Sequence, residues 1–177
     1  IDVVVQAAAT TSGSKDIVER PHIHITDNAV MNSYLMREAY ERNVHQFIFF
    51  SCTVMYPSSD YPHDEESFNP SRPIKNSYFS GAWTKLYLEK MAEFYSSLGD
   101  IRYTIIRHSN VYGPHDKFDL EQSHVFGATV TKVLSSESEI TIWGSGEEKR
   151  DLLYIDDLID FVQVAIDQQE ARFGLYC

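Results

Sequence analysis

The sequence has little cysteine, no long apolar run and an excess of acidic over basic residues. Only Cys52 and Cys177 occur among its 177 residues, which argues against a disulfide framework and fits a reducing compartment. No apolar run approaches the length of a membrane span. The formal net charge of −11 repels nucleic acid and anionic lipid at long range. We therefore expect a cytoplasmic protein that binds neither nucleic acid nor membrane.

Two further absences concern ligands and the ends of the chain. Five histidines lack a thiol or carboxylate partner at the spacing of metal ligands, so we expect no metal site; they are His22, His24, His45, His63 and His115. No glycine-rich turn of the G-x-x-G-x-x-G type occurs. An apolar run opens the chain, and another is in progress where the chain stops. We expect the native protein to extend on both sides.

Short apolar runs alternate with stretches in which apolar residues recur at helical spacing. The runs at 2–5, 47–50 and 103–106 are typical of strands buried on both faces. The stretches that separate these runs, residues 27–42 and 79–98, have helical periodicity. This order requires crossovers between parallel strands, so it predicts an α/β fold with a doubly wound, Rossmann-type parallel sheet whose first elements are missing.

The helix predicted at 79–98 carries an aromatic stripe, which we take as its buried face. The stripe comprises Trp83, Tyr87, Met91, Phe94, Tyr95 and Leu98. Gly99 is expected to end this helix.

The pattern changes after Gly113-Pro114. We predict a helix at 123–134, short strands at 140–142 and 152–155, and a final helix that Asp156-Asp157 can cap. We assign residues 1–113 to the carboxyl-terminal portion of a cofactor domain. Residues 114–177 would form a substrate-binding region with a strand and a helix that return to the core.

Four segments in order resemble the extended short-chain dehydrogenases/reductases, the NAD-dependent epimerase/dehydratase family. They are the strand-end alanines in 4–9, the strand and hydroxyl pair in 47–57, Gly81-Ala82-Trp83-Thr84-Lys85 in the place of Tyr-x-x-x-Lys, and 107–114. Within this family the sequence most resembles the GDP-L-fucose synthases, in residues 112–118, 123–125 and 142–150.

The resemblance implies an epimerase/reductase that transfers hydride between NADP or NAD and a 4-keto nucleotide sugar, and a homodimer. The catalytic residues it implies are Lys85, Cys52, Thr53 and His124. The cofactor-binding residues are Ala7, Ala8, Asn28, Ser51, Lys85 and His108. The substrate-binding residues are Asn110, Lys132, Trp143 and Arg150. Simpler roles compete: Cys52 as a small buried residue, Asn28 as a helix cap, His124 as a surface histidine and Trp143 as core packing.

The chain departs from the family at the catalytic tyrosine, which aligns with Gly81. Glycine carries no acid, so either the chemistry is lost or another group replaces the phenol. Tyr78 lies one helical turn earlier and could substitute only if the helix start is distorted. Val54 stands where fucose synthases have a proton-transferring cysteine.

Three functions therefore compete. The first is an active epimerase/reductase of the fucose-synthase kind. The second is a nucleotide-sugar 4-epimerase or 4,6-dehydratase, although a dehydratase would carry Asp-Glu where Val54-Met55 stand. The third is a non-catalytic homologue that binds a nucleotide sugar or cofactor. In all three we expect Arg150 to face the cleft of Lys85 and Asn110, and we expect the isolated piece to bind NAD(P)H weakly because it lacks the phosphate-cradling turn.

Overall fold

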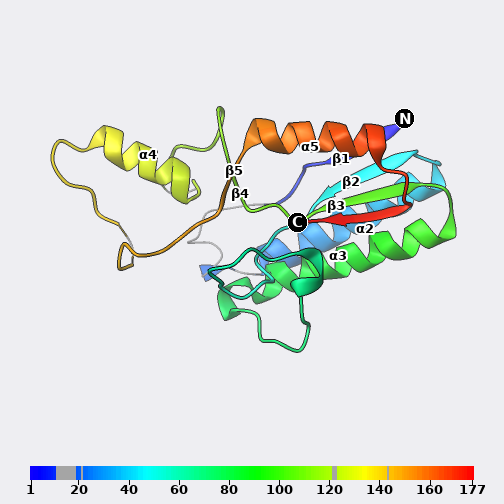
Figure 1. The fold of residues 1–177 in the computed structure, drawn as a ribbon, viewed down its shortest axis with the longest axis horizontal. Helices are drawn as coiled ribbons and strands as arrows, with labels where there is room; N and C mark the ends of the chain where they lie inside the picture. Colours follow the sequence, from blue (N-terminus) through cyan, green and yellow to red (C-terminus); the bar gives the residue numbers. More distant parts are fainter. Residues whose placement is uncertain (11–18, 21, 121–122, 143) are drawn as a thin grey trace.

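The computed structural model describes residues 1–10, 19–20, 22–120, 123–142 and 144–177 (Figure 1). Its elements are β1 (Val3–Gln6), α2 (Ile23–Glu41), β2 (Gln46–Phe50), the single-turn helices η1 (Glu65–Ser67) and η2 (Asn76–Tyr78), α3 (Phe79–Leu98), β3 (Arg102–Ile106), β4 (Asn110–Tyr112), α4 (Val125–Ser135), β5 (Leu152–Tyr154), α5 (Ile155–Gln168) and β6 (Phe173–Tyr176). None of the helices described is both long and apolar enough to span a membrane.

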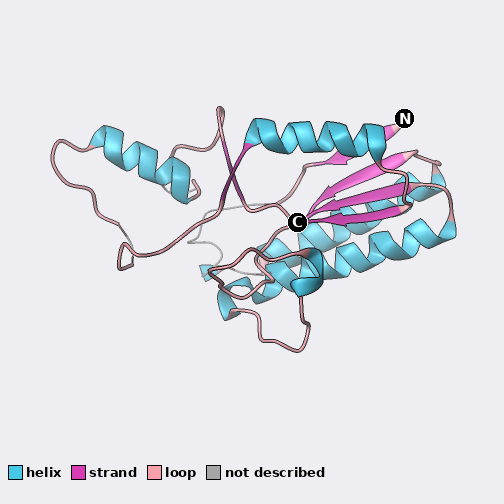
Figure 2. Cartoon of the chain, in the orientation of Figure 1, coloured by secondary structure: helices cyan, strands magenta, loops and turns pink. Residues whose placement is uncertain are grey.

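The main sheet has four parallel strands in the order β1-β2-β3-β6. Helices α2 and α3 cover one face and α5 covers the other, so the layers follow a helix–sheet–helix order (Figures 1 and 2). The predicted Rossmann-type α/β fold is confirmed. Because all four strands are parallel, their carboxyl ends meet at one edge of the sheet.

Alternation along the strands explains why their sequences are apolar throughout. Phe47, Phe49 and Tyr103 belong to the core cluster that packs on α2 and α3. Ile48 and Ile106 point the other way and pack with Leu158 of α5. Both faces of β2 and β3 are covered, so neither strand needs a polar face.

Helix α3 has the predicted bounds but not the predicted buried face. Apart from Glu89, its buried positions carry small or aliphatic side chains; they include Ala82, Leu88, Ala92 and Ser96. Four members of the aromatic stripe are exposed: Trp83 by 39%, Tyr87 by 54%, Phe94 by 58% and Leu98 by 47%. Only Met91 and Tyr95 of the stripe pack against the core. Small residues allow α3 to lie close to α2 and the sheet, which leaves the large rings outside.

Two other expectations need correction, and the element formed by the last apolar run is identified. Residues 140–142 form no strand; β5 pairs instead with β4, a strand that the sequence analysis missed. The apolar run at the end of the chain forms β6, which pairs with β3. Helix α5 begins at Ile155, so Asp156 and Asp157 lie inside its first turn and do not cap it. Their negative charges still interact favourably with the positive end of the helix dipole.

Candidate active site at the carboxyl edge of the sheet

The segments that follow β1, β2 and β3 lie side by side at the carboxyl edge of the sheet, the usual ligand-binding edge of an open parallel sheet. Ala7 and Ala8 follow β1 and are exposed. Thr53 follows β2, and His108 follows β3. The fold thus brings together residues that the sequence analysis selected from three separate segments.

Lys85 reaches this edge from α3. Its Nζ donates a hydrogen bond to the carbonyl oxygen of Phe50, the last residue of β2, at 2.5 Å. The same ammonium lies 4.5 Å from the centroid of the Phe49 ring. Burial lowers the pKa of Lys85, while the nearby Cys52 and Glu89 groups act to raise it. The side chain is therefore a half-buried cation at the end of β2, not a solvated helix lysine.

Gly81 lies in the first turn of α3, and an added Cβ there would meet no atom within 4 Å. Tyr78, the residue considered as a substitute for the missing phenol, precedes the helix and is 37% exposed. The Lys75 ammonium lies 5.6 Å from the centroid of its ring. Tyr78 is therefore in contact with a different lysine from the one that the family motif requires.

Cys52 and Thr53 have different surroundings. Cys52 packs against an apolar cluster that contains Ala82 and Leu86 of α3, and burial raises the pKa of its thiol. The Thr53 hydroxyl donates to the backbone oxygen of His108 at 3.5 Å. Thr53 also lines the cavity described below. Of the two, only Thr53 lines the cavity, where its hydroxyl oxygen can still accept a hydrogen bond from a ligand.

A buried polar network lies beneath the site, and the sequence analysis missed most of it. The Glu89 carboxylate accepts two bonds from the Arg107 guanidinium, at 3.1 and 2.6 Å. It also accepts the Ser51 hydroxyl at 2.5 Å. Arg107 donates a further bond to the Tyr56 hydroxyl at 2.6 Å. One signal was available: Glu89 and Arg107 are charged residues that adjoin otherwise apolar stretches.

Asn28 holds the backbone that follows β1. Its side chain accepts from the Thr10 amide at 2.9 Å and donates to the Thr10 carbonyl at 3.0 Å. Since α2 begins at Ile23, Asn28 is not a cap of this helix. Gln6 and Asn32 extend the network, because Gln6 donates to Asn32 at 3.0 Å and Asn32 donates to the Asn28 carbonyl at 2.7 Å.

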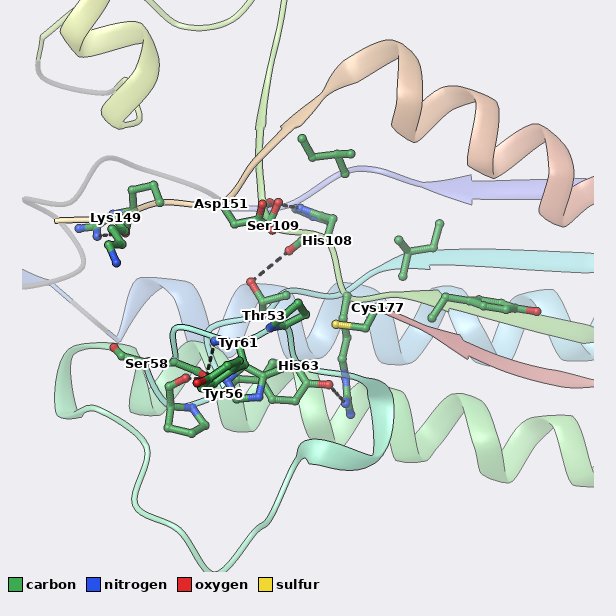
Figure 3. Close-up of a pocket in the computed structure, with 18 of the residues that line it drawn as sticks. Thr53, Tyr56, Ser58, Tyr61, His63, His108, Ser109, Lys149, Asp151 and Cys177 are labelled. Atoms are coloured by element: carbon green, nitrogen blue, oxygen red, sulfur yellow. Dashed lines mark hydrogen bonds between the residues drawn. The ribbon is translucent and has the colours of Figure 1, made fainter.

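A cavity of about 990 Å³ opens beside these strand ends (Figure 3). Three segments contribute most of its wall: 56–63 after β2, 106–109 after β3, and 149–151 before β5. Lys149 and Asp60 connect two of these segments through an exposed ion pair of 3.0 Å. Within the described residues, the cavity wall therefore combines three cations and three carboxylates with aromatic and hydroxyl groups; the carboxylates are those of Asp60, Asp151 and Asp157.

His108 lies in the wall of this cavity. Its Nδ1 lies 2.7 Å from the Ser109 carbonyl oxygen, which suits a neutral ring protonated at Nδ1. Its ring meets that of Phe50 edge-on, with centroids 6.0 Å apart. Burial lowers the pKa of His108, and the Lys85 charge lowers it further.

The predicted substrate residues are only partly brought together. Arg150 lines the cavity, and Asn110 donates to the carbonyl of the adjacent Asp151 at 3.0 Å. Lys85 is not among the lining residues. His124 directly precedes α4 without a side-chain capping bond, and Lys132 on that helix donates to the Thr141 carbonyl at 2.8 Å. Neither lines the cavity, and Trp143 lies outside the described residues. Among the residues with a described position, no three His, Cys, Asp or Glu side chains could hold a metal ion together.

The fold is that of a Rossmann-type α/β protein, in which this edge of the sheet is the usual ligand-binding edge. The pattern of the NAD dependent epimerase/dehydratase family matches residues 1–174, so the chain belongs to that family, as the motifs predicted.

Relatives in this family act on nucleotide sugars, to judge by their names. The chain is 29% identical over 164 residues to GDP-L-fucose synthase of Sinorhizobium fredii, covering 89% of the chain and 51% of that protein. It is 25% identical over 169 residues to GDP-L-colitose synthase of Yersinia pseudotuberculosis, covering 93% and 55%. A GDP-L-fucose synthetase from Naegleria fowleri bound to NADP shares the fold, with a TM-score of 0.84, 23% identity and coverage of 99% and 59%. The chain thus spans about half the length of the curated relatives it matches.

Proposed function

We propose that this chain is part of an NAD(P)-dependent nucleotide-sugar epimerase/reductase of the GDP-L-fucose synthase kind. The observation that carries the proposal is the Lys85 ammonium, held 2.5 Å from the Phe50 carbonyl at the carboxyl edge of the sheet. It belongs to the segment that takes the place of the family's Tyr-x-x-x-Lys motif. We also propose that residues 1–113 belong to the cofactor domain, that 114–177 contribute the substrate region, and that the whole protein is a homodimer in the cytoplasm.

The strand ends fit a nicotinamide dinucleotide. Small, exposed alanines follow β1, and Asn28 fixes the backbone after them through Thr10, so a flat cofactor could lie along this edge. Lys85 would hold the nicotinamide ribose, and His108 would lie beside the nicotinamide ring. The Ser51 hydroxyl is already bound to Glu89, so Ser51 would contribute its backbone alone. The dinucleotide, when bound, supplies or accepts the hydride.

The cavity fits an anionic, polyhydroxylated ligand. In a chain of net charge −11, two cations lie beside the Thr53 and Ser109 hydroxyls: Arg150, and Lys149, which is paired with Asp60. A diphosphate needs local cations of this kind, and a guanidinium suits its oxygens. We propose that Arg150, with Asn110 beside it, binds the diphosphate of a nucleotide sugar. We assign Lys132, His124 and Trp143 to the same substrate.

A non-catalytic role as a nucleotide-sugar or cofactor-binding protein is the second candidate. Gly81 favours it, because no phenol is present at this position and Tyr78 contacts Lys75 instead. A 4-epimerase or 4,6-dehydratase of the same superfamily is a weaker alternative, since Val54 and Met55 offer no acid–base groups.

The full-length protein tests these candidates. Calorimetry would measure binding of NADPH, NADH and GDP or UDP sugars, and oxidation of NADPH would be followed with a GDP-4-keto-6-deoxy sugar. Turnover of the keto sugar supports the reductase, whereas binding of both ligands without turnover supports the non-catalytic role. Absence of binding to any nucleotide sugar and to either nicotinamide dinucleotide would reject both.

A further inference from the structure

We propose that Lys85 is itself the proton source of this site, and that a water molecule beside Gly81 carries the proton to the substrate oxygen. The inference rests on the proposed reductase function and deepens it. It assigns the role of the missing phenol to a group that, in a Tyr-x-x-x-Lys site, would only assist a tyrosine.

The first observation is the space at Gly81. Four residues separate Gly81 and Lys85, so both lie on one face of α3, about 6 Å apart along the helix axis. A Cβ added at Gly81 would meet no atom within 4 Å, and the residue is half-buried. The space next to this position is therefore open to a small molecule such as water. A water molecule there would have Lys85 on one side and the strand-end edge on the other.

The second observation is the state of the ammonium. Within the described part of the chain, Lys85 has one hydrogen-bond acceptor, the Phe50 carbonyl, so two of its three protons remain for other partners. The ionisable groups that act on it are Cys52 after β2, Glu89 on its own helix and His108 after β3. Burial lowers the pKa of Lys85, which makes its ammonium a stronger acid than one in water.

Four other candidate donors near this edge are engaged elsewhere. Tyr78 contacts Lys75, and the Cys52 thiol packs among apolar side chains. The Thr53 hydroxyl donates to the His108 backbone. The Nδ1 of His108 is engaged by the Ser109 carbonyl, so its neutral ring presents an acceptor at Nε2 rather than a proton.

The step balances with a reduced nicotinamide as the reductant. Hydride adds to the C4 carbonyl carbon of the sugar, and the carbonyl π electrons move to the oxygen. That oxygen takes a proton from the water, and the water takes one from the Lys85 ammonium. The products are a C4 hydroxyl, an oxidised nicotinamide and a neutral Lys85 amine, which regains a proton from solvent.

Substitutions in the full-length protein test this route, with NADPH and a GDP-4-keto-6-deoxy sugar as substrates. Gly81→Phe fills the space without adding a proton donor. We expect kcat to fall by about 10²-fold or more, while the Kd for NADPH stays unchanged because Lys85 is retained. Lys85→Arg keeps the positive charge but replaces the ammonium by a guanidinium that does not lose its proton in the pH range of the assay. We expect a low kcat that no longer declines at high pH. Lys90→Met, on the exposed side of the same helix, is the matched control and should leave kcat and its pH profile unchanged.

A spectroscopic measurement supplies a readout independent of turnover. NMR titration of labelled lysine, with Lys85→Arg for assignment, should give a Lys85 pKa below the ordinary lysine range. The wild-type kcat should fall as pH rises through that same value, because the reduction uses the ammonium form. A profile that follows a different pKa would overturn the proposal.

The remaining outcomes are also decisive. If Gly81→Phe retains wild-type kcat, the water route is wrong. If Tyr78→Phe or His108→Gln abolishes turnover and Lys85→Arg keeps both the rate and the pH profile, another acid acts and only the assignment of Lys85 fails. If the wild-type protein binds both ligands and never reduces the keto sugar, the proposed reductase function fails as well.

Discussion

The Arg107 guanidinium and the Glu89 carboxylate form a bidentate ion pair beneath the candidate site, and each side chain is only 4% exposed. Burial alone would lower the pKa of Arg107, but the bonds to Glu89 more than offset this and raise it. The pair joins α3 to the end of β3, and through the Ser51 hydroxyl it also reaches β2. The helix that carries Lys85 is thus fixed to the carboxyl ends of β2 and β3, beside the candidate site.

Removing one charge of this pair should be costly. In Glu89→Gln the side chain keeps its shape, but the buried guanidinium loses its counter-charge, so we expect a loss of about 3–5 kcal/mol in the free energy of unfolding. Urea titration followed by circular dichroism measures it. Glu93→Gln is the control, because its partner Lys90 is 80% exposed and such pairs are worth about 0–1 kcal/mol. Equal losses in the two variants would mean that the buried pair contributes no more than the surface one.

The exposed stripe on α3 leads to a second stability prediction. Tyr87→Gln should change the free energy of unfolding of the monomer by less than about 0.5 kcal/mol, since the ring is 54% exposed. Ala92→Leu, on the fully buried face, should cost about 1–3 kcal/mol by overpacking. Thermal and urea unfolding at low protein concentration compare them. A larger loss in Tyr87→Gln than in Ala92→Leu would mean that the aromatic stripe is the buried face of α3.

Cys52 should be a slow thiol. Burial raises its pKa, so at a given pH it holds less thiolate than an ordinary cysteine, and the thiolate is the reactive form. We expect alkylation of Cys52 by iodoacetamide at pH 8 to be slower in the native protein than in urea, with the native rate rising only at higher pH. Peptide mass spectrometry resolves Cys52 from Cys177. Equal rates in both states would point to an accessible, activated thiol and would favour a catalytic role.

The fold could largely be predicted from the sequence, because buried parallel strands carry a continuous apolar signal. The runs that became β2 and β3 are visible as runs of Phe, Ile and Tyr, and α3 has its predicted bounds. The strand β4 could not be predicted in this way: it has three residues and exists only because β5 lies beside it. The buried face of α3 was misread because aromatic spacing shows where large side chains lie, whereas close packing selected Ala82 and Ala92.

The positions of Lys85 and His108 near the strand ends could be predicted because a motif fixes the backbone there, whereas their roles remain predictions. The Glu89–Arg107 pair was missed because its partners come from different segments, and only the fold brings them together. The roles of His124 and Lys132 depend on α4, and neither residue lines the cavity. Those assignments remain predictions.

Gly81→Tyr is the substitution that bears most directly on catalysis. The new side chain would project from the helix face that carries Lys85, and its Cβ would meet no atom within 4 Å. A phenol there could protonate the C4 oxygen directly, with the neighbouring ammonium lowering its pKa. General acid catalysis contributes about 10²–10⁴-fold, so the rise in turnover of a 4-keto nucleotide sugar by the full-length protein should be easy to measure. The substitution should also stabilise α3 by up to about 1 kcal/mol, because glycine is the poorer helix former.

Gly81→Phe is the matched control for this gain, because it has the same ring without the hydroxyl. A rise with Tyr and a fall with Phe would place the proton-transfer position at residue 81. If wild-type protein already turns over at ordinary rates and Tyr78→Phe abolishes that activity, then Tyr78 is the acid and the assigned position is wrong. If neither the wild-type protein nor Gly81→Tyr turns over although NADPH and nucleotide sugar both bind, the absence of the phenol does not explain the lack of turnover, and the protein is a binding homologue whose site has lost more than one catalytic group.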